Sequence, residues 1–226
     1  MMTMLIKRGF LILLLTFFAF ITYSQEKDFG IWYNISAEHK LLDKLELDLS
    51  TTLRTFDNAS KVEEIFFEGG LTYKLNKFLS IGGAYRITEN YEDDDSYHLR
   101  HKWYADLKGS VEAGDFDFSG HFRFQRRYKT YFEDEEDKIP DMHGRYRIKA
   151  VYKTPSFPVN PYISTEIFCP LNKDPERIVD KFRYMGGIEY KISKKHVIEA
   201  KYIYQRDYFP KLRDENIISV DYNFKF

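Results

Sequence analysis

The chain has 226 residues, with 34 Lys and Arg against 35 Asp and Glu, and its formal net charge is -1. Aromatic residues make up 18% of it, which excludes a disordered chain because such chains are poor in aromatic side chains. The balanced charge provides no overall positive field, and we therefore expect no nucleic-acid partner.

The first 24 residues are typical of a signal peptide. Lys7 and Arg8 precede an apolar run at residues 9–21, and polar sequence begins at Gln25. This run is shorter than the roughly 20 residues of a membrane-spanning helix. We therefore predict that residues 1–24 are a cleaved signal peptide and that residues 25–226 form one exported domain. The lone Cys169 excludes a disulfide scaffold in that domain.

The remaining sequence alternates between apolar and polar residues, as β-strands do. Leu45, Leu47 and Leu49, for example, alternate with Glu46 and Asp48. Candidate strands begin near residues 30, 44, 61, 78, 97, 116, 141, 160, 181, 196 and 216. All of them have a clear inward or outward phase except the segment at 160–168.

The connections between these segments alternate in length. Short connections are expected at residues 76–77, 109–115, 154–160 and 193–195. Longer polar connections are expected at residues 89–96, 133–141, 169–180 and 207–216. Antiparallel hairpins with short turns at one end and longer loops at the other are typical of transmembrane β-barrels.

Three features favour a membrane barrel over a soluble one. Aromatic residues such as Tyr73 and Trp103 lie near the strand ends, as in interfacial girdles. The segments at 43–55 and 116–132 reach the roughly 9 to 11 residues that a strand needs to cross a bilayer. The chain also ends on an alternating strand closed by Phe226, which resembles the terminal assembly signal of bacterial outer-membrane barrels.

The number of strands follows from counting the candidate segments. Eleven candidates are found, whereas single-chain bacterial barrels have even counts. Either residues 29–39 do not span the membrane or one strand has been missed. We therefore expect an all-β fold, an antiparallel transmembrane β-barrel of ten to twelve strands.

The sequence resembles a known family in several segments. These are SQ at 24–25, FGIWYNIS at 29–36, the segments at 44–58 and 68–86, and the terminal YNFKF. They resemble the domain-of-unknown-function 2490 family, a set of small outer-membrane β-barrel proteins of Gram-negative bacteria. The resemblance implies a cell outer-membrane location, with outer-membrane lipid and the barrel assembly machinery as partners. It implies no activity and no site residue.

If the apolar alternates face outward, the charged residues line the lumen. The candidate charge network comprises Arg100, Arg123, Arg127, Arg145 and Arg147 on the middle strands and Glu64, Glu68 and Glu199 on the flanking strands. In a narrow barrel these side chains would pair across the lumen and plug it, because an unpaired charge in a confined space is costly. In a wider barrel the two walls would flank water and create a transverse field.

No pattern of catalytic or metal-binding residues stands out. The six histidines are scattered and show no zinc-binding spacing, and a GxSxG motif is absent. Ser119 with His121 or with His143 would be coincidental pairs. The acidic runs at 92–95 and 133–137 lack EF-hand spacing, and we expect them to be solvated loops. We therefore name no catalytic residue, metal ligand or cofactor.

We expect an outer-membrane barrel protein that is not an enzyme and that acts as a small channel or a structural envelope protein. One alternative is a barrel enzyme that modifies lipid or lipid A at the outer leaflet. Another is a secreted soluble barrel that binds a small apolar ligand.

Overall fold

The structure is a computed structural model that describes residues 28–226, except 93–94, 133–134, 156, 174 and 210. The predicted signal peptide, residues 1–24, lies outside the described residues. The described chain contains no helix that is long and apolar enough to cross a membrane.

Eleven strands and one short 3-10 helix account for most of the described chain. The strands are β1 (Asp28–Leu42), β2 (Leu45–Phe56), β3 (Lys61–Lys74), β4 (Leu79–Tyr91), β5 (Tyr97–Ala113), β6 (Phe116–Lys129), β7 (Asp141–Tyr152), β8 (Val159–Pro170), β9 (Lys181–Lys191), β10 (His196–Asp207) and β11 (Arg213–Lys225). The 3-10 helix η1 (Glu136–Lys138) lies between β6 and β7.

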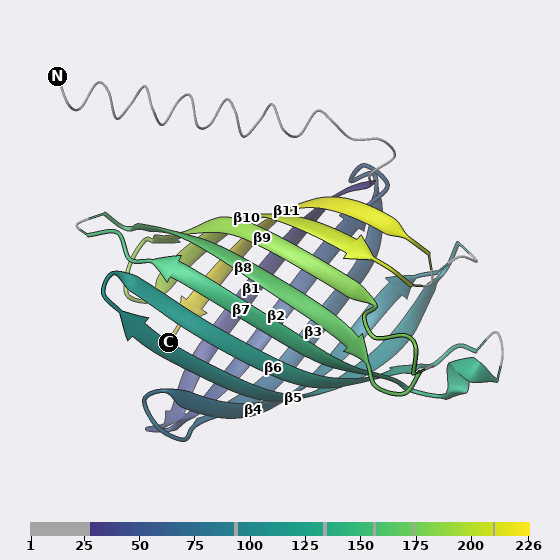
Figure 1. The fold of residues 1–226 in the computed structure, drawn as a ribbon, viewed down its shortest axis with the longest axis horizontal. Helices are drawn as coiled ribbons and strands as arrows, with labels where there is room; N and C mark the ends of the chain where they lie inside the picture. The colour runs from purple at the N-terminus through teal and green to yellow at the C-terminus, as the bar shows by residue number, and fades with distance from the viewer. Residues whose placement is uncertain (1–27, 93–94, 133–134, 156, 174, 210) are drawn as a thin grey trace.

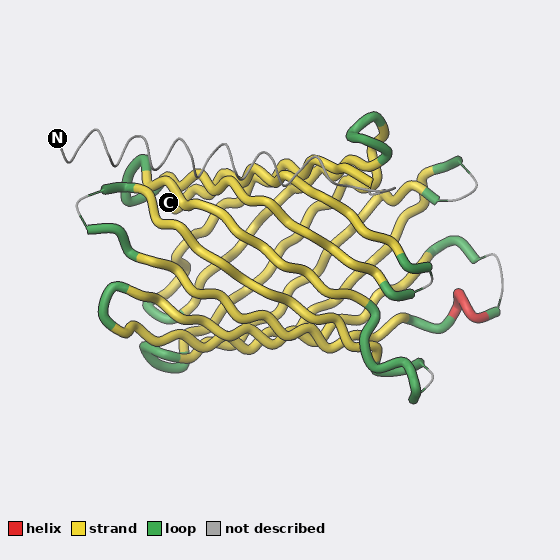
Figure 2. The backbone as a smooth tube through the Cα atoms, turned by 45° about the horizontal axis from the view of Figure 1, so that its top comes forward, coloured by secondary structure: helices red, strands yellow, loops and turns green. Residues whose placement is uncertain are grey.

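The strands close into one barrel and wind obliquely around its axis (Figures 1 and 2). Consecutive strands pair antiparallel, whereas β1 and β11 pair parallel, from Asp28 with Glu215 to Glu38 with Lys225. The expected all-β barrel of ten to twelve strands is confirmed, and its eleven strands correspond to the eleven candidate segments, although the count is not even. An odd number of up-and-down strands leaves the first and last strands running in the same direction, so the ring can close only by parallel pairing. Neither alternative for reaching an even count holds: residues 29–39 belong to β1, which pairs with β11 on one edge and with β2 on the other.

The two ends of the barrel differ in their connections, as predicted (Figure 1). The turn between β5 and β6 is tighter than expected, because residues 109–113 continue β5. The opposite end carries the longer connections at 130–140 and 171–180. It also carries a tight turn in which Asp57, Asn58 and Ala59 all have positive φ angles.

Side chains alternate between the two surfaces of the barrel as the sequence predicts. Phe67 and Ile163 are 65% and 70% exposed on the outside, whereas Glu64 and Glu166 are 5% and 4% exposed on the inside. In the segment at 160–168 the sequence did not show which residues face inward, because the inward side chain of Tyr162 is itself largely apolar. Tyr162 is only 6% exposed. The barrel is therefore apolar outside and charged inside.

The curvature of the closed sheet explains why position 187, which faces inward, is a glycine. A Cβ atom on Gly187 would lie 2.7 Å from the Ala200 carbonyl oxygen and 2.9 Å from the ring of Tyr162. A Cβ atom on the neighbouring, outward-facing Gly186 would meet nothing within 4 Å. Side chains converge on the concave face of a closed sheet and diverge on its convex face, so Gly187 makes room for the Tyr162 ring.

The barrel contains one small apolar core, located inside it. Trp32 on β1, Ile203 on β10 and Ile217 on β11 form a buried cluster, with Met185 of β9 packed against it. This cluster lies beside the parallel pairing of β1 and β11 and packs the inner side of the strands that close the ring.

The charged lumen as candidate functional site

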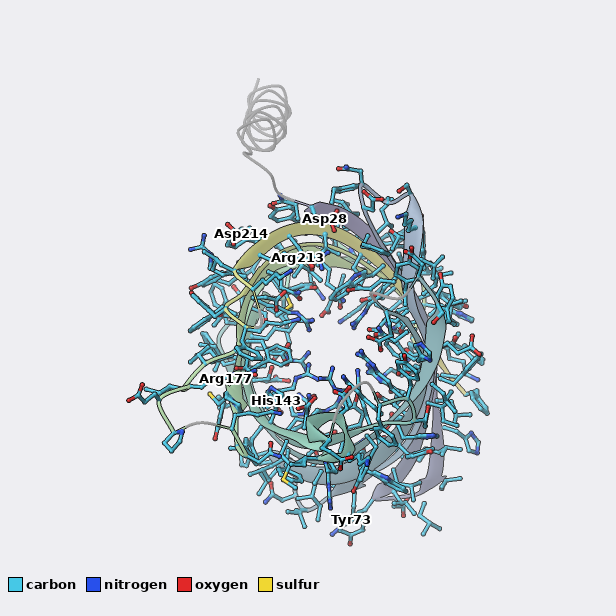
Figure 3. All side chains as sticks on the ribbon, turned by 90° about the vertical axis from the view of Figure 1, so that its right-hand side faces the viewer. Asp28, Tyr73, His143, Arg177, Arg213 and Asp214 are labelled. Carbon is cyan, nitrogen blue, oxygen red and sulfur yellow. The ribbon has the colours of Figure 1, made fainter. Side chains whose placement is uncertain are left out.

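Inward-pointing side chains surround an open centre when the barrel is viewed along its axis from the end with the longer loops (Figure 3). Asp28 and Arg213 lie at this mouth and form an ion pair at 2.5 Å, which links β1 to β11. Tyr73, by contrast, lies on the outer side of the wall (Figure 3). The lumen is therefore lined mainly by polar and charged groups.

Arginine and aromatic side chains form a ring around the lumen, which we call the arginine–aromatic belt. Its members come one from each of β1 to β9 in order: Trp32, Arg54, Phe66, Arg86, Tyr104, Arg123, Arg145, Phe168 and Arg183. The guanidinium carbons of Arg86 and Arg54 lie 3.6 Å and 3.8 Å from the ring centroids of Phe66 and Trp32. Arg183 lies 5.0 Å from the Trp32 centroid and so brings the belt back to β1. Each such cation–π contact contributes roughly 0.5–2 kcal/mol, depending on how far the cation is desolvated.

Each belt arginine also has a carboxylate partner. Arg54 binds Glu64, and Arg86 binds Glu68 at 2.7 Å. These contacts involve two of the glutamates that the sequence analysis selected.

The partners of the other belt arginines were not predicted. Arg123 binds Asp106 through two hydrogen bonds of 2.7 Å and 2.8 Å. Arg145 binds Glu166 at 2.8 Å, and Arg183 lies 3.6 Å from the same carboxylate. The two carboxylates lie on β5 and β8, next to the strands of the arginines that they neutralise.

The lumen charges pair along the wall rather than across the lumen. Lys149 on β7 reaches farthest among the described residues, to Glu189 on β9 at 2.6 Å and to Glu199 on β10 at 3.7 Å. Glu199 also binds Lys201 at 2.9 Å and accepts a hydrogen bond from Tyr162. From the basic middle strands, only Lys102 on β5 forms an ion pair with these two glutamates, Glu64 and Glu68, in the described chain, at 3.9 Å from Glu64. Glu64 and Glu68 otherwise pair with arginines of the strands next to β3.

The predicted Arg100 and Arg127 lie near the mouth with the longer loops. Arg100 forms an ion pair with Glu92, and Arg127 forms one with Asp141. Glu92 belongs to a run that we had expected to be solvated, so at least part of that loop is held against the wall. Asp93, Asp94, Glu133 and Asp134 lie outside the described residues.

Two lumen cations have no carboxylate partner in the part of the chain that the structure describes. They are Lys108 on β5 and Arg147 on β7, and His121 on β6 lies in register between them. Arg147 Nη2 lies 3.0 Å from His121 Nδ1, and His121 Nε2 lies 2.9 Å from Asp106. This arrangement fits a neutral imidazole that donates to Asp106 and accepts from Arg147. We call these three residues the Lys108–His121–Arg147 row.

The histidines near serine residues form different contacts from those considered in the sequence analysis. His121 contacts Asp106 rather than Ser119, and His143 Nε2 lies 2.6 Å from Asp180. The structure instead places Ser96 Oγ 2.7 Å from His98 Nε2 at the mouth, where the His98 ring stacks on Tyr131. Within the described chain, no group of three or more His, Cys, Asp or Glu residues could hold a metal ion.

The outer surface carries a large apolar groove of about 1430 Å³. It extends from the start of β4 to β10, and its lining includes Gly120, Ile148, Ile163, Gly186 and Tyr202. Small outward residues such as Gly120 and Gly186 form the low parts of this surface. The groove thus belongs to the apolar exterior and not to the lumen.

Comparison with known proteins agrees with the fold. A family model described as "Protein of unknown function (DUF2490)" matches residues 29–216. No curated protein matches the chain. Among solved structures, the NanC porin is similar with a TM-score of 0.57 and 15% identity, over 88% of this chain and 99% of that one. The β domain of the Bordetella autotransporter BrkA is similar with a TM-score of 0.56 and 10% identity, over 83% of this chain and 86% of that one.

At these identities the two solved structures establish a shared barrel fold. The family match extends from β1 into β11 and thus covers nearly the whole ring of strands. It agrees with the strand and turn segments in which the sequence resembles that family, and the chain therefore belongs to the DUF2490 family.

Proposed function

We propose that this protein is a small channel of the bacterial outer membrane, exported by a signal peptide at residues 1–24. The observation that carries the proposal is the distribution of side chains, with apolar residues outside the barrel and charges inside. A soluble barrel has the reverse distribution, because its exterior contacts water.

The exterior supports insertion into a bilayer. The strands are 11 to 17 residues long, which exceeds the roughly 9 to 11 residues that a tilted strand needs to cross the hydrocarbon layer. Outward aromatic side chains such as Trp103 and Tyr184 are more than half exposed. A closed ring of strands also satisfies every backbone hydrogen bond within the sheet, as a span in lipid requires. Outer-membrane lipid and the barrel assembly machinery are accordingly the proposed partners.

The interior supports a water-filled passage. Ion pairs run along the wall and leave the centre unbridged, and belt side chains such as Arg54 and Arg145 keep 17% and 15% of their surface exposed. Charges that retain water while facing a lumen are typical of a pore constriction. The porin fold of one structural neighbour is consistent with this role.

Planar-bilayer recording tests the proposal. Purified protein, folded in detergent and shown to be heat-modifiable on a gel, should produce discrete conductance steps in KCl. Heat-unfolded protein at the same concentration is the control and should give none. A folded barrel that inserts into the bilayer without conducting would overturn the channel and leave a structural envelope protein. Recovery of the protein in the soluble periplasmic fraction would overturn the membrane location as well.

A further inference from the structure

We propose that the Lys108–His121–Arg147 row is a binding site for the oxyanion of a solute, such as a carboxylate or phosphate group, inside the lumen. The inference rests on the proposed channel for the solute's route, but the site itself depends only on the fold. It is distinguished from the rest of the wall by positive charge that no carboxylate of the described chain neutralises.

The three side chains are held next to one another by the sheet. Lys108 and His121 are paired in register between β5 and β6, and His121 and Arg147 are paired between β6 and β7. Residues opposite one another on neighbouring strands have Cβ atoms about 4.5–5.5 Å apart. Because His121 already donates its N–H to Asp106, a single small anion would be contacted by the long side chains of Lys108 and Arg147, from the two strands on either side of it.

Nearby carboxylates are already engaged elsewhere. Asp106 is held by Arg123 through two hydrogen bonds and by His121 through a third. Glu166, in register with Arg147, is shared by Arg145 and Arg183. Neither cation of the row therefore has a carboxylate of the described chain within ion-pair distance, and the attraction of Asp48 to Lys108 and of Glu166 to Arg147 acts only at longer range.

The neighbouring residues of the belt also include charges and donors that an anion would stabilise. Arg123 and Arg145 are direct partners across β6 and β7, although like charges in such positions repel one another. The Tyr104 hydroxyl and Arg145 Nε are buried without a hydrogen-bond partner. Buried donors without a partner are uncommon and call for an explanation such as a bound ion or water.

The wall beside the row leaves room for a solute. The residues of β4 in register with Lys108, Asp106 and Tyr104 are Ser80, Gly82 and Ala84. These residues carry short side chains or none, so this part of β4 adds little bulk to the lumen beside the row. There the planar guanidinium of Arg147 suits an oxyanion because its parallel N–H groups match two oxygens, while Lys108 supplies a compact charge.

Phosphate binding to the folded protein in detergent tests the site without requiring conduction. Inorganic phosphate is titrated at constant ionic strength, with chloride as the replaced anion, and the unfolding temperature is followed. We expect phosphate to stabilise the wild-type protein. In Lys108→Gln plus Arg147→Gln the apparent affinity should fall about tenfold or more, because two charge-assisted contacts are lost.

The matched control is Lys77→Gln plus Lys194→Gln, which removes the same charge from turns outside the lumen. It should retain the wild-type response, including the general stabilisation of proteins by phosphate. If the row variant responds to phosphate as the control does, the site is refuted. Should the double variant fail to fold, Arg147→Lys and Lys108→Gln are tested singly, and an unchanged phosphate response in both refutes the site equally.

The two proposals fail in distinguishable ways. A phosphate response that depends on the row, in a barrel that does not conduct, supports the site and overturns the channel. Conductance with no phosphate response at the row supports the channel and overturns the site. Competition experiments, in which glucuronate or glucose 6-phosphate is added against bound phosphate, show whether the site prefers a sugar carboxylate or a phosphate ester.

Discussion

The two halves of the inner wall differ in how completely their groups are partnered. The seam half comprises β9, β10, β11 and β1, where the ring closes by parallel pairing. There Trp32, Ile203 and Ile217 pack together, and Lys201 lies between the carboxylates of Glu199 and Asp221. The basic half comprises β5, β6 and β7, where Lys108 and Arg147 have no carboxylate partner in the described chain.

This difference separates the part of the wall that stabilises the barrel from the part available to a solute. Burying Trp32 with two isoleucines stabilises the seam, because each large apolar side chain contributes roughly 1.5–3 kcal/mol when fully buried. Arg147 makes a hydrogen bond to His121 but no ion pair, so the desolvation of its charge is less fully compensated than that of the belt arginines. Such a cost is typical of functional sites, where local rules are broken and compensated elsewhere.

The largest expected effect is a loss of stability when the paired arginines of the basic half are removed, compared with the removal of its unpaired cations. Arg123→Ala plus Arg145→Ala should lower the free energy of unfolding strongly, because it removes the nearest cation from two carboxylates whose side chains are only 7% and 5% exposed. Asp106 then keeps only His121, and Glu166 keeps only Arg183 at 3.6 Å. Breaking one buried pair costs about 3–5 kcal/mol. Lys108→Gln plus Arg147→Gln should cost far less, since it leaves no carboxylate without a partner. Denaturant unfolding in detergent measures both.

A second variant identifies the cause of this effect. Removing both members of one pair, as in Arg123→Ala plus Asp106→Ala, should recover part of the stability lost in Arg123→Ala alone, because no charge is then left unpaired. Equal losses for the paired and unpaired cations would contradict the distinction between them.

A somewhat smaller effect tests whether the charged face of the wall faces the lumen at all. Leu47→Arg places a charge on the apolar exterior, whereas Asp48→Arg places one inside, where Asp48 accepts a hydrogen bond from Thr72. An arginine facing lipid near the bilayer centre costs about 2–4 kcal/mol. Leu47→Arg should therefore reduce the folded fraction in lipid vesicles much more than Asp48→Arg. The reverse order would show that the inner and outer surfaces have been exchanged.

Much of the fold could be predicted from the sequence because strand alternation is local information. The same alternation identified Arg123 and Arg145 as inward residues. It could not identify Asp106 as the partner of Arg123, because pairing depends on register. That register was available in principle, since Asp106 and Arg123 are equidistant from the turn at Gly114 and Asp115. The turn had been expected over residues 109–115, and this range was too broad to fix the register.

Other features depended on contacts that no short segment contains. The parallel closure of β1 on β11 joins residues nearly two hundred positions apart, and the usual even strand count argued against it. The arginine–aromatic belt takes one residue from each of nine strands. Trp32 and Phe168 appeared in the sequence as apolar residues, and only their place in the closed ring brings them beside arginines.

Phe226 at the seam should affect assembly more than the stability of the finished barrel. Its amide donates to the Glu38 carbonyl at 3.0 Å, and its ring stacks on His39 of β1 at 4.5 Å. Deleting Phe226, or replacing it with Asp, should lower the amount of heat-modifiable barrel in the outer-membrane fraction while export continues. Phe78→Asp, in a turn, is the control. Undiminished assembly without Phe226 would contradict its predicted role as an assembly signal.

The smallest expected effect, on ion selectivity, bears most directly on the comparison of the wall's charges. Neither Arg147 nor Asp48 on β2 forms an ion pair in the described chain, and Lys108 attracts Asp48 only at longer range. Neutralising either one should therefore leave the barrel stable and change only the field in the lumen. Arg147→Gln should shift the reversal potential in a KCl gradient towards cation selectivity, and Asp48→Asn should shift it towards anion selectivity. A change of about twofold to threefold in the permeability ratio corresponds to only about 0.4–0.7 kcal/mol.

The control is Lys225→Gln, which removes one member of an ion pair at the rim. It should shift the reversal potential little, because that pair is exposed to solvent and screened. Shifts of the same sign for Arg147→Gln and Asp48→Asn would mean that the two side chains do not act on a common water-filled lumen.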